Sequence, residues 1–526
     1  MARLFLGLDS STQSLSAVVI DLDMRKVVHE KSINFDQALP QFKTRHGVLP
    51  HRDPLLKHSP PLLWAAALDL IFAQLKKDGV ALGKILAVSG CGQQHGSVYL
   101  NEKAAAALAN LDPKKSLVEN LDGIFARKTS PIWMDSSTAK ECAEIRKKLG
   151  GIKYTASRTG SDTFERFTGP QIRKFYKTEP NAYAKTAGIA LVSSFMASLL
   201  AGKIAPIDFG DGAGMNLMDI RRKNWNHDAL KATAPGLINK LPPLAESGRV
   251  IGPVSPYFVN KFGLNPAALA TVWTGDNPAS ALGLGLIKPG AAAISLGTSD
   301  TFVATMDKCQ TDESGEGHVF ASPTGGSLAL ICFKNGSLAR EKIRALYKIS
   351  DWKKFGELVA QTPPGNNGGI LLPWFEPEIV PRVHQPSVRR FDLEEKNVAA
   401  NCRAIFEAQM LALRLHSQWM QMAPEKIFAT GGAANDPALL QVMADVLNCR
   451  VQRIEISKSA ALGAALQAAH GWLVAADKNP QWEKLVAGFC DPVPGSEIRP
   501  DKKAAKIYDK LLEKYAASEY SALHGD

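Results

Sequence analysis

Asp276 is a candidate for a side chain that takes part in proton transfer. It lies in Thr274-Gly275-Asp276-Asn277-Pro278, where a predicted strand ends and an alanine-rich helix begins. A carboxylate held at such a point can orient an attacking hydroxyl group and accept its proton, which phosphoryl transfer uses. Asp276 or Asn277 can instead simply cap the helix. Taken alone, the segment favours the cap.

Two turns rich in hydroxyl groups have the composition of a phosphate site. The first, at 10–14, contains Thr12, and the second is Gly297-Thr298-Ser299. The backbone N–H groups and hydroxyls of such turns can approach phosphate oxygens closely. Asp9, at the end of the first predicted strand, is placed to hold Mg²⁺ through water beside the phosphates. An ordinary polar hairpin turn explains either segment equally well.

Two glycine-rich loops follow predicted strands and suit other parts of a ligand. The loop at 89–96 concentrates the amide and imidazole groups of Gln93, Gln94 and His95, which fits a ligand with many hydroxyls. The loop at 429–437 contains Gly431-Gly432 and Asn435, where paired glycines let a flat adenosine lie close to the main chain. A structural histidine and a capped glycine turn are the alternatives.

The organisation of the chain favours a duplicated α/β fold. A strand–turn–strand pattern at 4–20 returns at 291–305, a separation too long for a solenoid repeat. Apolar strands alternate with helical stretches between these points, which predicts mixed α/β layers. The Gly- and Pro-containing stretch at 284–290 marks a boundary, so we expect domains at 1–286 and 287–526.

The C-terminal helix is expected only to pack. From residue 498 onward the sequence reads as a charged helix, with Ala504, Ile507, Leu511 and Tyr515 spaced to form one apolar stripe.

Composition narrows the class of protein. The 526 residues are 45% hydrophobic and 21% charged, which is typical of globular chains. Seven cysteines are scattered without zinc-site or CxxC spacing, which favours reduced thiols in the cytoplasm. The net charge of +11 suits an anionic ligand such as a nucleotide, but the basic residues are dispersed, so neither nucleic acid nor membrane is expected as a partner. A monomer or homodimer is expected.

Together and in this order, these segments resemble the FGGY family of carbohydrate kinases. The resemblance implies an α/β fold of two duplicated, actin-like (ribonuclease H-like) domains with a catalytic cleft between them. It extends from the first hairpin to the helix around 460–465. The stretches that are similar to the eukaryotic-type xylulose-kinase branch of the family are 92–97 (GQQHGS), 133–137 (WMDSS), 165–169 (ERFTG) and 274–280 (TGDNPAS).

The resemblance also implies roles for individual residues, with ATP and Mg²⁺ as cofactors and D-xylulose as the sugar phosphorylated to D-xylulose 5-phosphate. Asp276 is implied as the general base. The implied sugar contacts are His95, Arg166, Asp276 and Asn277, and Gln94 joins them from its loop. The implied nucleotide contacts are Trp352, Gly431, Gly432 and Asn435, and those near the phosphates and the metal are Asp9, Thr12, Gly297, Thr298 and Ser299.

Some alternatives stay open on these residues alone. Many family members have glycine and threonine after the first aspartate or an arginine later in that turn, whereas this chain has Ser10, Ser11 and Gln13, so the phosphate grip can differ in detail. Trp352 can also belong to an amphipathic helix that packs its aromatic residues. Ribulose, glycerol or another polyol can replace xylulose as substrate. A rival of another class is a sugar or nucleotide sensor without activity, or a chaperone-like ATPase.

Overall fold

The computed structural model describes residues 3–525, which fold into two compact units. The first unit extends through Ile287 and also contains Val319–Ser327 and Ile456–Cys490. The second unit consists of Lys288–His318, Leu328–Glu455 and the chain from Asp491 onward. Within residues 3–525 no helix is both long and apolar enough to cross a bilayer.

The sheet of the first unit is built around the hairpin at the start of the chain. Strands β1 (Leu4–Ser10) and β2 (Ser14–Asp21) are antiparallel, and on its other side β1 pairs in parallel with β5 (Ile85–Gly92). The strand order is β13-β14-β5-β1-β2-β3, and β15 also pairs with β5. The other strands of this sheet are β3 (Lys26–Asn34), β13 (Val250–Pro253), β14 (Leu269–Thr271) and β15 (Thr274–Gly275).

The sheet of the second unit repeats this arrangement. Strand β16 (Ala292–Leu296) is antiparallel to β17 (Asp300–Met306) and parallel to β22 (Lys426–Thr430). The order continues as β19-β17-β16-β22-β23, with β19 at Ser327–Phe333 and β23 at Arg450–Arg453. The duplicated α/β arrangement that the sequence predicts is therefore confirmed within each unit taken by itself.

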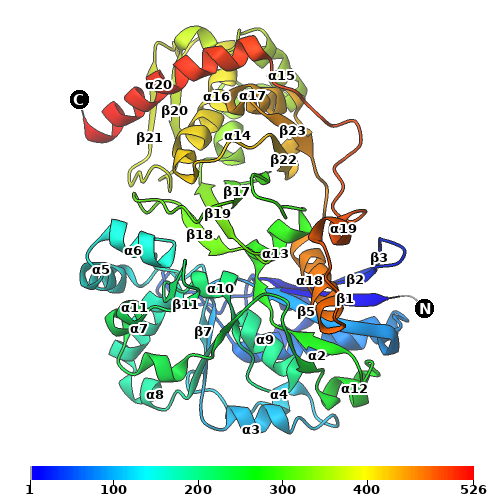
Figure 1. Ribbon diagram of the computed structural model, residues 1–526. Coiled ribbons are helices and arrows are strands. Elements are labelled where there is room, and N and C mark those ends of the chain that lie inside the picture. Colours follow the sequence, from blue (N-terminus) through cyan, green and yellow to red (C-terminus); the bar gives the residue numbers. More distant parts are fainter. Residues whose placement is uncertain (1–2, 526) are drawn as a thin grey trace. The chain divides into compact units, whose positions relative to one another are not determined.

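Helices cover both faces of the first sheet because the side chains of β1 alternate. Leu4, Leu6 and Leu8 belong to the same core cluster as α2 (Pro61–Lys77), whereas Phe5 belongs to the cluster around α18 (Ser459–Ala475). Gly7 permits the close approach of α18, since a Cβ there would lie 2.0 Å from a backbone oxygen of that helix. Figure 1 shows α18 beside β1 and β5. Residues near 460 thus complete a core that begins at residue 4.

Shorter elements of the first unit surround this core. The helices are α1 (Phe35–Ala38), α3 (Ala104–Ala109), α4 (Leu117–Asn120), α5 (Ala139–Lys148), α6 (Ile152–Thr159), α7 (Thr168–Thr178), α8 (Pro180–Ala184), α9 (Val192–Ala201), α10 (Phe209–Ala213), α11 (His227–Thr233), α12 (Pro256–Phe262), α13 (Asp276–Gly283) and α19 (Trp482–Val486). The short strands are β4 (His58–Ser59), β6 (Ser97–Leu100), β7 (Ser130–Pro131), β8 (Gly188–Leu191), β9 (Ile207–Asp208), β10 (Met218–Asp219), β11 (Asn224–Trp225) and β12 (Leu244–Ala245), and β18 is His318–Ala321.

The second unit is organised around α16 (Val398–His416), which is buried along most of its length. It contacts α14, α15, α17 and α20, so a helix of this composition needs no exposed polar face. These elements are α14 (Ser337–Leu346), α15 (Trp352–Ala360), α17 (Pro437–Leu447), α20 (Lys502–His524), β20 (Ile370–Trp374) and β21 (Ser387–Phe391).

The apolar stripe expected on the C-terminal helix is shifted from the predicted one. Ala504, Leu511 and Tyr515 of α20 are buried, but Ile507 is 45% exposed and Tyr508 is buried in its place. The tyrosine turns inward because its hydroxyl donates to Glu407 at 2.7 Å and accepts from Arg403 at 2.9 Å, both on α16. A buried polar pair on another helix therefore decides which face of α20 packs.

Candidate active site

Three parallel strands of the first unit end at one edge of its sheet. Asp9 of β1 lies opposite Cys91 of β5, and Gly275 of β15 lies opposite Gly92. Because the carboxyl ends of parallel strands share an edge, this register brings Asp9, the loop after β5 and Asp276 together. Asp9 and Asp276 are close enough that the charge of Asp276 adds to the effect of burial in raising the pKa of Asp9 to about 7.

Asp276 is the first residue of α13, and the N-cap position belongs to Gly275. The carboxylate oxygen Oδ1 of Asp276 accepts from the backbone N–H of Asn277 at 2.9 Å and from its side-chain Nδ2 at 3.1 Å. Burial raises the pKa of Asp276 to about 6 from an ordinary value of 3.8. The side chain is thus oriented by its neighbour and can exchange a proton near neutral pH.

The amide side chains of the loop after β5 leave two donors without partners. Asn277 Nδ2 donates to Gln94 Oε1 at 2.8 Å, and Thr12 Oγ1 donates to Gln93 Oε1 at 3.4 Å while it accepts from Trp133 Nε1 at 2.8 Å. The Nε2 atoms of Gln93 and Gln94 are buried and have no hydrogen-bond partner among the described residues. Since buried donors are costly when unpaired, this edge is suited to a ligand with oxygen acceptors.

His95 is held as a neutral imidazole. Its Nδ1 lies 2.7 Å from the carbonyl oxygen of Gly214, so the ring must carry its proton on Nδ1 to donate there. Burial and the nearby charge of Arg166 lower the pKa of His95 to about 3. The imidazole packs on the Phe167 ring, with 4.4 Å between the two centroids. The Arg166 guanidinium lies 5.6 Å from the centre of the Phe167 ring. The Nε2 of His95 is therefore an acceptor at neutral pH.

The sequence patterns did not indicate one segment that supports these residues. α10 and its flanks, 208–216, carry Gly214, which anchors His95, and two fully buried carboxylates, Asp208 and Asp211. Asp208 accepts from Thr274 Oγ1 at 2.5 Å and from the backbone N–H of Asp211 at 2.7 Å, and Ser247 Oγ also donates to it. Asp211 accepts from Ser193, but its Oδ1 has no partner among the described residues. The alternation of acidic residues and glycines in 208–214 is the sequence feature from which this supporting segment could have been predicted.

In the second unit the predicted phosphate turn is short and anchored. The register pairs Leu296 with Asp300, which leaves only Gly297, Thr298 and Ser299 to form the turn. The backbone N–H of Ser337, at the start of α14, donates to the carbonyl oxygen of Gly297 at 2.9 Å. The turn is thus tied to a helix N-terminus, where backbone dipoles favour anions.

A cavity of about 770 Å³ opens between α14, α15 and the segment after β22. Its lining includes Trp352, Gly432, Asn435, Ser337 and Arg340. Trp352 is 36% exposed, whereas Phe355 of the same helix is buried against Phe406. Trp352 also packs on Phe355, with 5.3 Å between ring centroids, and it lines a cavity whose volume suits a nucleotide-sized ligand.

Gly431 joins this cavity to the phosphate turn. Its φ of +92° is a conformation that favours glycine, and a Cβ would lie 2.6 Å from the carbonyl oxygen of Leu296, the residue before the turn. The structure thus brings the predicted nucleotide residues of the second unit together: Gly297, Thr298, Ser299, Trp352, Gly431, Gly432 and Asn435.

Two domain models of the FGGY family of carbohydrate kinases match the chain, the N-terminal domain over residues 128–283 and the C-terminal domain over residues 292–472. The chain belongs to the FGGY family of carbohydrate kinases. A rat xylulose kinase is 40% identical over 99% of this chain and 97% of its own length. Xylulose kinase 2 of Arabidopsis thaliana is 43% identical over 89% of this chain and 87% of its own length.

Solved structures agree on the fold of this FGGY kinase. The xylulose kinase of Rhodospirillum rubrum superposes with a TM-score of 0.82 at 22% identity and covers 99% of both chains. A glycerol kinase of Plasmodium falciparum with ADP superposes with a TM-score of 0.76 at 15% identity and covers 98% of both. These likenesses establish the two-domain α/β architecture, and the sequence relatives establish the class of activity, a sugar kinase.

The surroundings of Asp9 fit a divalent cation whose ligands are mainly water and substrate phosphates. Asp9 is half-buried, and its carboxylate accepts a hydrogen bond from the Cys91 thiol at 3.5 Å. Within residues 3–525 no group of three or more His, Cys, Asp or Glu side chains forms a metal cage. Mg²⁺ needs no such cage, because it keeps several waters and binds substrate phosphates beside one or two carboxylates.

Proposed function

We propose that this FGGY kinase transfers the γ-phosphoryl group of ATP to the terminal hydroxyl of D-xylulose, giving D-xylulose 5-phosphate and ADP. The observation that carries the proposal is the identity of 40% with a xylulose kinase along almost the whole of both chains. Its sugar site is the carboxyl edge of the first-unit sheet. Its nucleotide site is the cavity of the second unit. Sugar binding is thus assigned to the domain at residues 1–286 and adenosine binding to the domain at residues 287–526.

Asp276 acts as the general base of this transfer. As the terminal sugar oxygen forms its bond to phosphorus, the bond from phosphorus to the β-phosphate oxygen breaks, ADP leaves, and the hydroxyl proton passes to the Asp276 carboxylate. Asn277 orients that carboxylate through its two hydrogen bonds. Burial and the raised pKa make the carboxylate basic enough for this step.

The sugar is recognised by groups of opposite hydrogen-bonding character. The neutral His95 accepts from a sugar hydroxyl at Nε2, and the unpaired Nε2 donors of Gln93 and Gln94 bind sugar oxygens. Arg166, beside His95, adds a cationic donor to the same site. A ketopentose offers both hydroxyl donors and oxygen acceptors, so it can satisfy all of these groups at once.

ATP is held by two parts of the second unit. The adenosine contacts Trp352, Gly431, Gly432 and Asn435, and the phosphates contact the turn Gly297-Thr298-Ser299. Thr12 and Asp9 serve the phosphates and metal from the first unit. Mg²⁺ held beside Asp9 would neutralise phosphate charge during transfer. A cytoplasmic location and a monomeric or dimeric state stay predictions.

Activity should fall as the solution is acidified from pH 7 to pH 5. The base must be ionised, and its pKa of about 6 places the loss in this range, whereas an aspartate with the ordinary value of 3.8 would keep its charge throughout. Protonation of Asp9, with a pKa of about 7, acts in the same direction. The measurement is kcat/KM for the sugar at saturating ATP against pH. A profile that is flat down to pH 5 contradicts the assignment.

Replacing Gly431 with valine should weaken nucleotide binding. A β-branched residue cannot adopt the φ of +92° without strain of about 1–3 kcal/mol, and its side chain would displace the end of β16. We expect KM for ATP to rise by about 10-fold or more, with little change in sugar binding. Gly290, which also has positive φ but nothing within 4 Å of its Cβ position, is a control for strain alone. Equal KM values for ATP in the two variants would contradict the prediction.

The test of the proposed function is ADP release from MgATP over a panel of ketopentoses, aldoses and polyols. We expect the highest kcat/KM for D-xylulose and little ADP release without sugar. A preference for ribulose or glycerol would reject D-xylulose as the substrate and keep the assignment as a carbohydrate kinase. ADP release that no sugar stimulates would reject the kinase function.

A further inference from the structure

Arg340 and Arg344 lie one turn apart on α14, and each contacts a different end of the nucleotide site. With Ser337 and Glu341 they occupy positions i, i+3, i+4 and i+7, which share one face of a helix. Ser337, Arg340 and Glu341 line the 770 Å³ cavity. Nothing in the sequence patterns pointed to either arginine.

Arg340 is committed to the phosphate turn. It is 2% exposed, and its Nη1 and Nη2 donate to the two carboxylate oxygens of Asp300 at 2.8 and 3.0 Å. Asp300 is the residue directly after Ser299, so this pair fixes the C-terminal end of the turn. A bidentate pair of this kind has a defined geometry as well as strength.

The remaining hydrogens of these two nitrogens are also in use. Nη1 donates to Gln409 Oε1 at 2.7 Å, and Nη2 donates to Ser337 Oγ at 2.9 Å. Four of the five donors of the guanidinium are therefore engaged within the protein. In this arrangement Arg340 has little left to offer a phosphate directly, so its effect on a nucleotide must pass through the turn that it holds.

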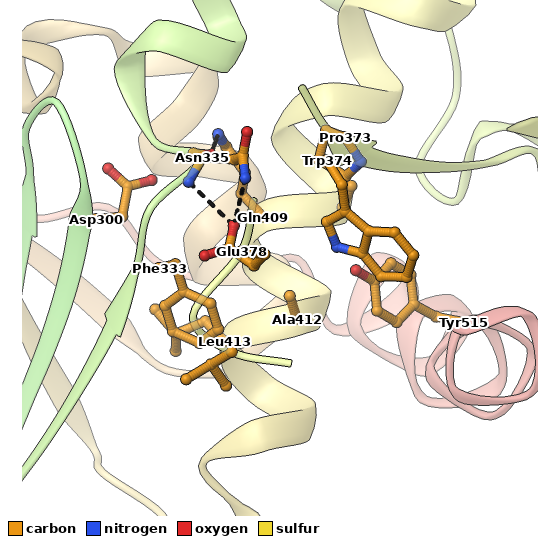
Figure 2. A pocket seen from close by; sticks show the side chains of 12 residues that line it. Asp300, Phe333, Asn335, Pro373, Trp374, Glu378, Gln409, Ala412, Leu413 and Tyr515 are labelled. Atoms are coloured by element: carbon orange, nitrogen blue, oxygen red, sulfur yellow. Dashed lines mark hydrogen bonds between the residues drawn. The ribbon is translucent and has the colours of Figure 1, made fainter. Parts of the chain in front are cut away.

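The loop before α14 supports the same turn from behind. Gly336 is required there because a Cβ would lie 2.8 Å from both the Thr298 oxygen and the Asp300 nitrogen. Its neighbour Asn335 donates to Glu378 from its backbone and its side chain, at 3.0 and 2.8 Å (Figure 2). Asp300 and Gln409 border a second, smaller cavity of about 20 Å³, which has room for about one water molecule. The turn is thus backed by a tightly packed polar network.

Arg344 serves the other end of the site. Its guanidinium lies 5.1 Å from the centre of the Trp352 ring, a cation–π distance. Two hydrogen bonds hold it there, from Nε to Glu341 Oε2 at 3.0 Å and from Nη1 to the carbonyl oxygen of Ser350 at 3.3 Å. The Trp352 ring also lies 5.3 Å from the Phe355 ring, so two contacts fix its orientation at the border of the cavity that it lines.

We propose that Arg340 and Arg344 are positioning residues that divide the nucleotide site, Arg340 by setting the phosphate turn and Arg344 by setting Trp352 against the base. This inference rests on the proposed function, because it needs a nucleotide in the cavity. The inference goes beyond the proposed function in one respect. The contributions of the phosphates and of the base to nucleotide affinity depend on different residues of α14, Arg340 and Arg344.

The test compares the affinities of adenosine and ADP by titration calorimetry with the full chain. Replacing Arg340 with methionine should weaken ADP by about 10-fold or more and leave adenosine within about 2-fold, since the ion pair that is lost is the one that fixes the phosphate turn. Arg344→Met should weaken both ligands by the same factor, about 3-fold. Lys342→Met is the matched control, because Lys342 is an exposed cation of the same helix that pairs with Glu376, and both affinities should stay as in the wild type.

Because Arg340→Met leaves Asp300 buried without its partner, that variant can lose its fold. The double variant Arg340→Met/Asp300→Leu removes both charges and should show the same selective loss of ADP affinity. Steady-state rates give a second readout: the Arg340 variants should lower kcat and raise KM for ATP, whereas Arg344→Met should raise only KM for ATP, with KM for the sugar unchanged in all.

Two results overturn the division. One is an unchanged ratio of adenosine to ADP affinity in a folded Arg340 variant, and the other is a changed ratio in Arg344→Met. Either result rejects the inference and leaves the proposed function standing. If the wild-type chain binds neither ligand, the proposed function fails as well, so the two kinds of failure can be told apart.

Discussion

Replacing Asp276 with asparagine should lower kcat by about 10²-fold or more while ATP affinity stays within about 2-fold, because a general base contributes about 10²–10⁴-fold to such a transfer. The asparagine can keep its place: its side-chain oxygen can still accept the two hydrogen bonds from Asn277 that the carboxylate accepts now. What it cannot do is take a proton from the sugar. The measurement is kcat from ADP release at saturating xylulose and MgATP, with the ATP affinity determined separately.

The pH profile of this variant separates loss of the base from loss of structure. Its residual rate should fall less steeply between pH 7 and pH 5 than that of the wild type, since the group with a pKa of about 6 has been removed. Asp69→Asn is a matched control in the same unit. The Asp69 carboxylate accepts from the Tyr257 hydroxyl at 2.6 Å and from the backbone N–H of Leu117 at 2.7 Å, and it pairs with Lys261 at 3.6 Å. The control should lower the melting temperature but not kcat. A turnover near normal in Asp276→Asn would remove Asp276 from its role.

The second large effect is expected at Asp208, which touches neither substrate. Its buried carboxylate accepts from Thr274, Ser247 and the backbone of Asp211, and so joins β15, the chain after β12 and α10. In Asp208→Ala these donors lose their acceptor, at a cost of about 1–3 kcal/mol for each buried group left unpaired. We expect the free energy of unfolding to fall by about 3 kcal/mol or more, measured by urea denaturation.

Single-bond variants show which part of this junction serves the reaction. Thr274 lies on β15, two residues before Asp276, so Thr274→Val should shift the base and lower kcat by about 10-fold or more, since a displacement of 1 Å can cost about 10²-fold. Ser247→Ala removes a hydrogen bond to the same carboxylate from a residue outside that strand. It should lower stability by a similar amount and leave kcat within about 2-fold. Equal effects of both variants on kcat would show that Asp208 acts on stability alone.

The sequence by itself determined the class of the protein. The hairpins at 4–20 and 291–305 are local structures whose alternating apolar residues and polar turns specify them directly, so the duplication is visible in the order of residues alone. The segments around Gln94 and Asp276 follow strands and carry unusual combinations of residues, which sufficed for the family. The roles of individual residues in the sugar and nucleotide sites stay predictions, because they depend on ligands.

Only the tertiary structure decided how those segments are held. Asp208 and Thr274 are 66 residues apart, and Arg340 and Asp300 are 40 apart, so no local pattern connects them. The same is true of α18, whose small residues meet Gly7 across more than 450 positions. Periodicity and turn composition report on neighbours in the chain, whereas buried polar pairs are selected by packing between distant elements. The chemistry was therefore visible in the sequence, and the framework that positions it was not.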